Sequence, residues 1–512
     1  MDTIEKVYDY IVVGAGSAGS VAAAELAKVG TNSVLLLDAG ASPEPIKDVW
    51  DPYLNNNLYG KDGVWWRGYK SPKYAGTSEM TGVPRSKLFG GCSSVNDMVY
   101  SRGAEADYNR WENLYKCYGW SAAEVKGHFE ALEKVLDPTI CHEPDEFGQH
   151  FLEACSQQGL PLFDYNSLEG PMFGVSPLRS TISPRTIRET TFQSFILDSI
   201  IPQGNLKLEQ GTCSKVLFDA NKAVGIEYIP VSGGELVSVV CKREVILSAG
   251  AINSPKILLS SGIGDPHYLA SKGIPLVARS PQVGKNLQDQ TIFSLSWATN
   301  TPLQVPRPAP NGNRRNEGFA IAWANLDPDT NQPKNCVEMM PGLYVANQTE
   351  EQLENNFTIT GGGMRLQSRG TVELADGSDY INAPPKINLN RFAVESDMAE
   401  CVAAFKFVRS LAYSPAFGRI RGPESASSRG AQSPSEIEAW LKENSMSYSH
   451  PSCTCAMGPV GSGAVVDPTL KVIGTENLRV MDASVMPEIT SGHTQAPSFM
   501  IGHKGASMIL GK

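Results

Sequence analysis

Three glycines, spaced as Gly14-x-Gly16-x-x-Gly19, follow a short apolar run at residues 8–13 and precede a helix-compatible segment at residues 20–27. In such a pattern the first glycine permits a tight turn, and the second lets main chain approach a phosphate without a Cβ in the way. The third glycine allows the helix to pack closely on the strand, and the helix N-terminus offers N–H groups to an anion. The pattern predicts the first βα unit of a doubly wound α/β fold, with a dinucleotide bound at its turn.

A second apolar run, residues 34–37, ends at Asp38, nineteen residues after Gly19. An acid at this distance accepts hydrogen bonds from ribose hydroxyls, and it disfavours the 2′-phosphate of NADP. On this motif alone, both FAD and NAD remain open as the dinucleotide.

The composition excludes several classes of protein. Of the 512 residues, 41% are hydrophobic and 19% are charged, which is typical of a globular protein and not of a disordered or fibrous one. The formal net charge of −10 argues against nucleic acid or an anionic membrane as a partner, because either requires a basic surface.

The compartment is inferred from what the sequence lacks. The first six residues carry net negative charge where a secretory leader is positive, and we find no uninterrupted apolar run of about 18 residues. The ten cysteines are scattered without zinc-type spacing. We therefore expect a cytoplasmic protein with reduced thiols, no membrane contact and no metal site.

Further elements follow from periodicity and composition. Residues 215–218, 223–228 and 244–247 are predicted strands, and residues 398–410 and 434–443 have helical spacing. Residues 296–345 are rich in proline and asparagine without a clear period. That segment is expected to be irregular, either over a substrate cavity or as a surface excursion. The polar residues at 311–316 are compatible with a polar substrate.

Five glycine-constrained blocks resemble the glucose–methanol–choline (GMC) oxidoreductase family, in the family's order. They occupy residues 85–103, 250–264, 283–289, 450–458 and 478–484. The resemblance extends from Tyr10 to the end of the chain and implies an α/β fold. The implied fold consists of a Rossmann-like FAD-binding domain and an inserted α+β substrate domain. The substrate domain is expected to be an antiparallel sheet with helices. We expect residues 1–160, 205–292 and 455–512 in the FAD domain, and residues 161–204 and 293–454 in the substrate domain.

The resemblance also implies which residues bind FAD. Gly14 to Gly19 correspond to the pyrophosphate site, Asp38 to the ribose site, and Cys213 to the place where main chain meets adenine. Some choline-oxidising relatives attach the flavin covalently through a histidine where this chain has Val95, so we expect dissociable FAD. The residues expected to contact FAD are Gly14, Gly16, Ser17, Gly19, Asp38, Gly90, Gly91, Ser94, Asn96, Met98, Cys213, Asp482, Ala483 and Thr494.

Two of the seven histidines, His450 and His493, coincide with the family's catalytic positions. Oxidation of an alcohol requires a base for the hydroxyl proton, and histidine is suited to this because its ordinary pKa of about 6.5 lies near neutrality. The resemblance implies that His450 is the general base and that His493 is a second hydrogen-bonding partner for the alcohol oxygen.

Two positions depart from the family pattern. The block that ends at Asp289 is usually followed by histidine, and here it is followed by Gln290. Asp97 stands where glycine is common, which places a carboxylate close to the expected flavin. Whether Asp97 is buried beside the ring or points to solvent is left open.

The expected activity is oxidation of a small to medium primary alcohol, benzylic and allylic ones included, to the aldehyde by hydride transfer to the flavin N5 with a histidine base. The electron acceptor is O₂ or a quinone or artificial acceptor, and the oligomeric state is left open. The alternative is a non-redox member of the family, such as a hydroxynitrile lyase or a cyclase that keeps FAD as a scaffold.

Overall fold

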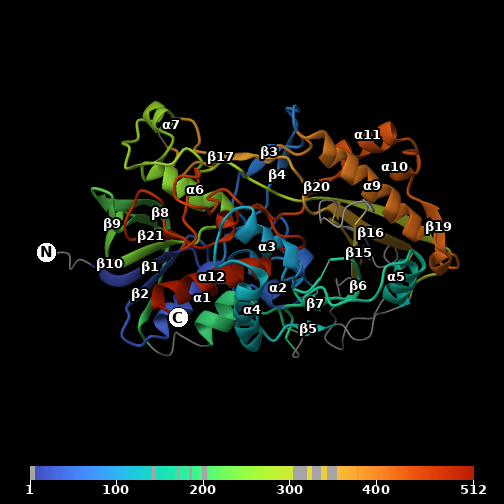
Figure 1. Cartoon of the computed structure of the whole chain (residues 1–512), viewed down its shortest axis with the longest axis horizontal. Helices are drawn as coiled ribbons and strands as arrows, with labels where there is room; N and C mark the ends of the chain where they lie inside the picture. Colours follow the sequence, from blue (N-terminus) through green and yellow to red (C-terminus); the bar gives the residue numbers. More distant parts are fainter. Residues whose placement is uncertain are drawn as a thin grey trace.

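The computed structural model describes residues 6–512 apart from 53, 141–145, 171, 184–186, 199–203, 304–319, 326–335, 343–354 and 378. Two large sheets lie at opposite ends of an elongated molecule (Figure 1). Segments from distant parts of the chain, including the C-terminal helix, lie between the two sheets (Figure 1).

The first sheet is built around a parallel core. Its strands run in the spatial order β8, β2, β1, β10 and β21, each paired in parallel with the next. Strand β9 pairs antiparallel with both β8 and β10. The strands are β1 (Val7–Val13), β2 (Val34–Asp38), β8 (Leu206–Asp219), β9 (Lys222–Pro230), β10 (Val237–Leu247) and β21 (Leu478–Val480).

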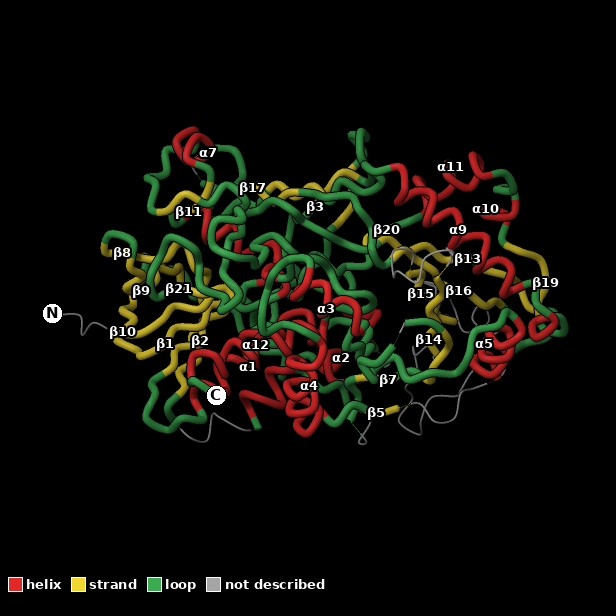
Figure 2. Tube along the Cα trace, viewed as in Figure 1, coloured by secondary structure: helices red, strands yellow, loops and turns green. Residues whose placement is uncertain are grey.

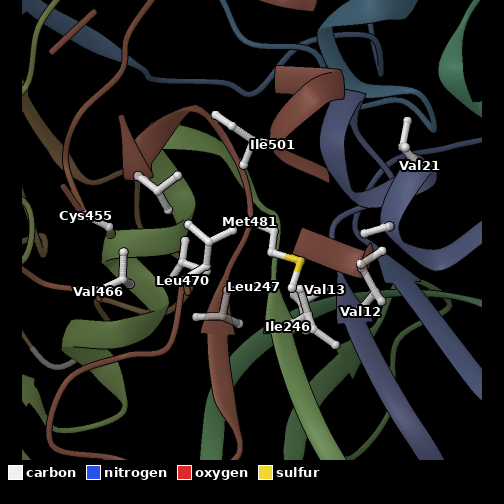
Figure 3. Close-up of a cluster of buried hydrophobic side chains, with 14 of the residues drawn as sticks. Val12, Val13, Val21, Ile246, Leu247, Cys455, Val466, Leu470, Met481 and Ile501 are labelled. Carbon is white, nitrogen blue, oxygen red and sulfur yellow. The ribbon is translucent and has the colours of Figure 1, made fainter. Parts of the chain in front are cut away.

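The predicted strand–glycine–helix pattern is confirmed. Strand β1 ends at Val13, and helix α1 (Ser17–Ala27) begins three residues after Gly14. Helix α1 packs against α12 (Gln495–Leu510), which also contacts α4 (Ala122–Leu136). Figure 3 shows the core around this sheet, where side chains from β1, β10 and the C-terminal segments meet.

The second sheet is antiparallel, with the strand order β19, β13, β16, β15, β14 and β6, and β20 paired with β13 (Figure 2). Along β13, Phe293, Leu295 and Trp297 alternate with more exposed residues and enter a core shared with helices. That alternation is typical of a sheet with one face against helices. The strands are β6 (Gly174–Pro177), β13 (Thr291–Thr299), β14 (Ala320–Asn325), β15 (Cys336–Gly342), β16 (Asn356–Gly363), β19 (Arg421–Glu424) and β20 (Met446–Ser447).

Helices α9 (Glu395–Ala412), α11 (Pro434–Asn444) and α5 (Glu146–Gln157) contribute to the core of the second sheet. The predicted helices at 398–410 and 434–443 are therefore confirmed.

The remaining helices and strands are α2 (Lys47–Trp50), α3 (Glu105–Asn113), α6 (Gly250–Ser260), α7 (Pro266–Ser271), α10 (Ala426–Arg429), β3 (Lys70–Pro72), β4 (Met80–Gly82), β5 (Thr139–Ile140), β7 (Arg179–Ser180), β11 (Ile263–Gly264), β12 (Ala278–Arg279), β17 (Thr371–Glu373) and β18 (Lys386–Asn388).

The expectation of irregular structure over residues 296–345 is wrong in part. The segment contains the end of β13 and the strands β14 and β15, because the antiparallel partners β6 and β16 complete their hydrogen bonds. The polar residues 311–316 lie outside the described residues. The domain boundaries expected from the sequence stay a prediction. Within the described part of the chain, no helix is both long and apolar enough to cross a membrane.

Candidate active site

A cavity of about 590 Å³ extends from the glycine turn after β1 to the two histidines. Its wall is made by segments that are far apart in the sequence, including the turns after β1 and β2, the segment before α3 and the residues that precede α12. The cavity therefore has two ends, which we call the nucleotide end (around Gly14, Gly16 and Asp38) and the histidine end (around His450 and His493).

Main chain forms most of the nucleotide end. Gly14 has φ +107°, and a Cβ there would lie 2.4 Å from the carbonyl oxygen of Ser248. Gly91, with φ +54°, approaches the first turn so closely that its Cβ would lie 2.8 Å from the Cα of Gly16. Because real Cβ atoms do not come this close to main chain, both positions require glycine.

Asp38 is held at the nucleotide end by two main-chain donors. The N–H groups of Ala15 and Gly40 donate to its two carboxylate oxygens, at 2.7 and 2.6 Å. Burial raises the pKa of this carboxyl to about 6, although the two hydrogen bonds favour its charged form. Each carboxylate oxygen retains a lone pair for a further donor such as a ribose hydroxyl.

The structure brings most of the predicted site residues to the cavity wall. Three of them do not reach it. A Cβ at Gly19 would lie 1.8 Å from the carbonyl oxygen of Gly14, so Gly19 serves helix–strand packing. Ser94 is fully buried and donates to the carbonyl of Phe89, and Gly90 precedes the same turn with φ +85°. The residues that line the cavity are Gly14, Gly16, Ser17, Asp38, Gly91, Asn96, Met98, Cys213, His450, Asp482, Ala483, His493 and Thr494.

His450 and His493 face one another at the histidine end. Their ring centroids are 5.0 Å apart, with an angle of 68° between the planes. Tyr448 completes the group, because its ring centroid lies 4.6 Å from that of His450 and 5.0 Å from that of His493. The three rings come from two segments that are brought together only by the fold.

His450 is held through its main chain and its ring. The N–H group of His450 donates to Asp289 at 3.0 Å, and its Nδ1 lies 2.6 Å from Oε1 of Gln290. Burial, followed by the neighbouring His493 and Arg85, holds the pKa of His450 well below its ordinary value. The shift favours the neutral ring, which is the state that accepts a proton.

A strained residue precedes His450. Ser449 has φ +63°, a conformation that costs a non-glycine residue on the order of 1 kcal/mol. The hydroxyl of Ser447 accepts from the N–H of Ser449 at 2.9 Å, and the guanidinium of Arg85 donates to its carbonyl. These contacts hold the turn that directs His450 into the cavity.

His493 contacts a different group. Its Nε2 lies 3.0 Å from Oε1 of Glu338, and the hydroxyl of Tyr448 donates to the same oxygen at 2.6 Å. Glu338 projects from β15 and is almost fully buried, at 2% exposure, behind the two rings. Glu338 thus joins His493 and Tyr448 in one group of polar contacts behind the cavity wall.

The sequence motifs assign no specific role at this site to Glu338 or Tyr448. Tyr448 lies two residues before His450, and its proximity to the histidine motif was the available signal. Glu338 lies between the apolar residues Val337 and Met339 and belongs to no motif. A single charge in a buried strand was its only signal, because the contact with His493 depends on the pairing of distant segments.

The chain belongs to the GMC oxidoreductase family. The N-terminal model of that family matches residues 8–292, and the C-terminal model matches residues 367–502. The fold is accordingly a mixed α/β GMC oxidoreductase fold, and the chain is an FAD-dependent oxidoreductase of a family that acts on alcohols.

Relatives of known activity cover nearly the whole chain. A human mitochondrial choline dehydrogenase is 32% identical over 99% of this chain and 90% of its own length. An oxygen-dependent choline dehydrogenase from Rhizobium johnstonii is 31% identical over 98% and 96%, respectively. The crystal structure of a pyridoxine 4-oxidase from Mesorbium loti superimposes with a TM-score of 0.86 at 25% identity, covering 99% of both chains.

The residues at the cavity wall fit FAD. Gly16 and Gly91 line the cavity without side chains, their main chains are in close approach, and the N-terminus of α1 begins at the same wall. Near the histidines, Nε2 of Gln495 is buried without a hydrogen-bond partner among the described residues, while its Oε1 accepts from Asn96 at 2.6 Å. An unpaired amide donor in a cavity wall suits a carbonyl or ring nitrogen of a bound flavin.

Proposed function

We propose that the protein oxidises a small to medium primary alcohol to the aldehyde, with His450 as the general base. The observation that carries the proposal is the pair of facing rings of His450 and His493 at the cavity wall, with centroids 5.0 Å apart and Tyr448 beside them. A second argument is that choline and pyridoxine, named for the relatives, both carry a primary alcohol.

In this proposal each residue has a definite task. FAD, when bound, would accept the hydride, that is the hydrogen and two electrons, that leaves the alcohol carbon. His450 takes the hydroxyl proton on its ring, and His493 hydrogen-bonds the same oxygen as negative charge develops on it. Tyr448 and the aromatic residues Trp65 and Trp66 narrow the cavity around the substrate and exclude water.

The test is an alcohol panel mixed with the holoenzyme under argon and again in air. The panel contains benzyl alcohol, an allylic alcohol, choline and pyridoxine, with the matching ethers or aldehydes as controls. Anaerobic bleaching of the flavin by an alcohol and not by its ether supports the proposal, and the aldehyde is identified as the product. Rapid recolouring in air identifies O₂ as the acceptor, whereas slow recolouring that a quinone accelerates identifies a dehydrogenase.

The same panel tests the non-redox alternative. A lyase or cyclase that uses FAD as a scaffold leaves the flavin oxidised with every alcohol. Absence of bleaching throughout the panel contradicts the proposed function.

We also propose that FAD is held without a covalent bond. Val95, at the position where some relatives carry the linking histidine, is buried among apolar side chains and offers no nucleophile. Acid precipitation is expected to leave the yellow colour in the supernatant. Colour that stays on the precipitated chain contradicts this proposal.

Two further proposals concern the setting of the protein. We propose a cytoplasmic location, on the basis of the scattered cysteines, and no nucleic-acid or membrane partner, on the basis of the acidic balance. Fractionation of cells with an antibody against the chain tests the location.

A further inference from the structure

Gln290 lies directly behind the ring of His450 and has no exposed surface. Its main-chain carbonyl accepts from the N–H of Tyr448 at 2.9 Å, just before the first residue pair of β13 and β20. Strand pairing therefore holds the glutamine against the turn that carries the histidine.

The amide of Gln290 can adopt only one orientation. Its Nε2 lies 3.1 Å from the carbonyl oxygen of Met364, 3.0 Å from that of Thr490 and 3.1 Å from that of Gly492. An amide NH₂ group donates to such carbonyls, whereas an amide oxygen in its place would face three other oxygens. The three carbonyls thus direct Oε1 of Gln290 towards His450.

This orientation determines where the proton on His450 lies. Oε1 of Gln290 is 2.6 Å from Nδ1 of His450, and an amide oxygen only accepts hydrogen bonds. Nδ1 must therefore carry a hydrogen. In the neutral ring, the other nitrogen, Nε2, then has a free lone pair, and no described residue donates to it.

We propose that Gln290 is a positioning residue that holds His450 in the tautomer with Nδ1 protonated and Nε2 free to accept the substrate proton. The importance of this contact for the rate rests on the proposed function, whereas the tautomer itself does not. Unlike a histidine at the same position, the amide cannot titrate or move its proton between two ring nitrogens. The direction of the hydrogen bond is thus independent of pH.

The other groups around His450 do not compete for Nδ1. Asp289 accepts from the main-chain N–H, and Arg85 donates to the carbonyl of Ser449. Tyr448 and His493 contact Glu338 and face the ring of His450 without a hydrogen bond to it. Gln290 is the group that the structure places on that nitrogen.

The first experiment measures the tautomer directly in the holoenzyme. ¹⁵N-labelled histidine is incorporated, and the His450 signals are identified by their loss in His450→Asn. Nitrogen shifts and long-range couplings are expected to show hydrogen on Nδ1 in the wild type and redistribution towards Nε2 in Gln290→Leu. Hydrogen on Nε2 in the wild type, or an unchanged tautomer in Gln290→Leu, overturns the proposal.

Gln288 offers a matched control. It is also a buried glutamine, and its Oε1 accepts from the N–H of Ile489 at 3.1 Å in the same C-terminal segment, but none of its hydrogen bonds within the described part of the chain goes to His450. Gln288→Leu is expected to lower stability without changing the His450 tautomer. If Gln288→Leu shifts the tautomer as much as Gln290→Leu does, the effect is structural and the proposal fails.

The second experiment measures the rate of anaerobic flavin bleaching by the best alcohol of the panel. For Gln290→Leu we expect a rate lower by roughly 10- to 100-fold, with the dissociation constant of the alcohol little changed, because the base is misdirected and the binding surface remains. Gln290→His, which retains an acceptor, is expected to recover most of the rate. An unchanged rate in Gln290→Leu overturns the proposed importance for the rate. If no alcohol bleaches the wild-type flavin, the proposed function fails, and the NMR experiment still decides the tautomer.

Discussion

The two ends of the cavity are built in different ways. At the nucleotide end, main-chain groups and glycines form the surface, and residues 14–38 supply its first turn, helix and acid. At the histidine end, side chains are held by other side chains from β15, the start of β13 and two C-terminal segments. A short local pattern can thus encode a glycine-lined turn, whereas the placement of the His450 ring depends on the whole fold.

The largest expected effect is at the histidine end. We expect His450→Ala to retain FAD and to lose flavin reduction by about 10³-fold, because a general base contributes about 10²- to 10⁴-fold. Anaerobic stopped-flow bleaching measures the rate, and the visible spectrum reports bound FAD. A wild-type rate in this variant would remove His450 from the mechanism.

Substitutions at the nucleotide end are expected to lower the affinity of the protein for FAD. Gly91→Ala places a Cβ 2.8 Å from the Cα of Gly16 in a left-handed conformation, so the two turns must separate. We expect FAD affinity to fall by roughly 10- to 100-fold, as about 1 to 3 kcal/mol of strain implies. Gly76→Ala is the control, because Gly76 has φ +82° with open space around its Cβ. Equal losses in both variants would show that the cradle itself is not the cause.

Substitution of His493 tests how the two histidines divide their roles at the histidine end. Because a hydrogen-bond partner stabilises charge without taking the proton, we expect His493→Ala to slow bleaching by about 10²-fold, less than the roughly 10³-fold loss in His450→Ala. Stopped-flow rates of the two variants with one alcohol provide the measurement. A larger loss in His493→Ala would reverse the assignment of base and partner.

The smallest expected effect concerns stability behind the second sheet. Glu400, on α9, lies beside Gly363, and burial raises its pKa to about 8, with Asp397 adding to the rise. Since the ordinary value is about 4.3, the folded state binds this proton more tightly than the unfolded state does. The resulting contribution to stability is lost as pH rises from about 4.3 to about 8.

Glu400→Gln removes this titration. We expect its Tm to exceed that of the wild type by a few degrees above about pH 8, with the difference shrinking as the pH is lowered. Thermal unfolding of apoprotein and holoenzyme across this range is the measurement. A Tm difference that does not depend on pH would show that Glu400 is not the titrating group.

Several features could be predicted because they are local. The glycine spacing and the run that ends at Asp38 placed the first βα unit, since turn geometry and strand burial act over a few residues. The helices at 398–410 and 434–443 followed from their periodicity. The strands β14 and β15 were not predicted, because their partners supply hydrogen bonds that local composition does not reveal.

The family, the glycine turn after β1 and the positions of His450 and His493 follow from the sequence alone. The folded chain was needed to place Glu338 behind His493 and to turn the amide of Gln290 towards His450. This difference arises because hydrogen bonds of buried side chains join residues far apart in the chain. Their direction is decided by the carbonyls and carboxylates that the packed sheets bring to the same place.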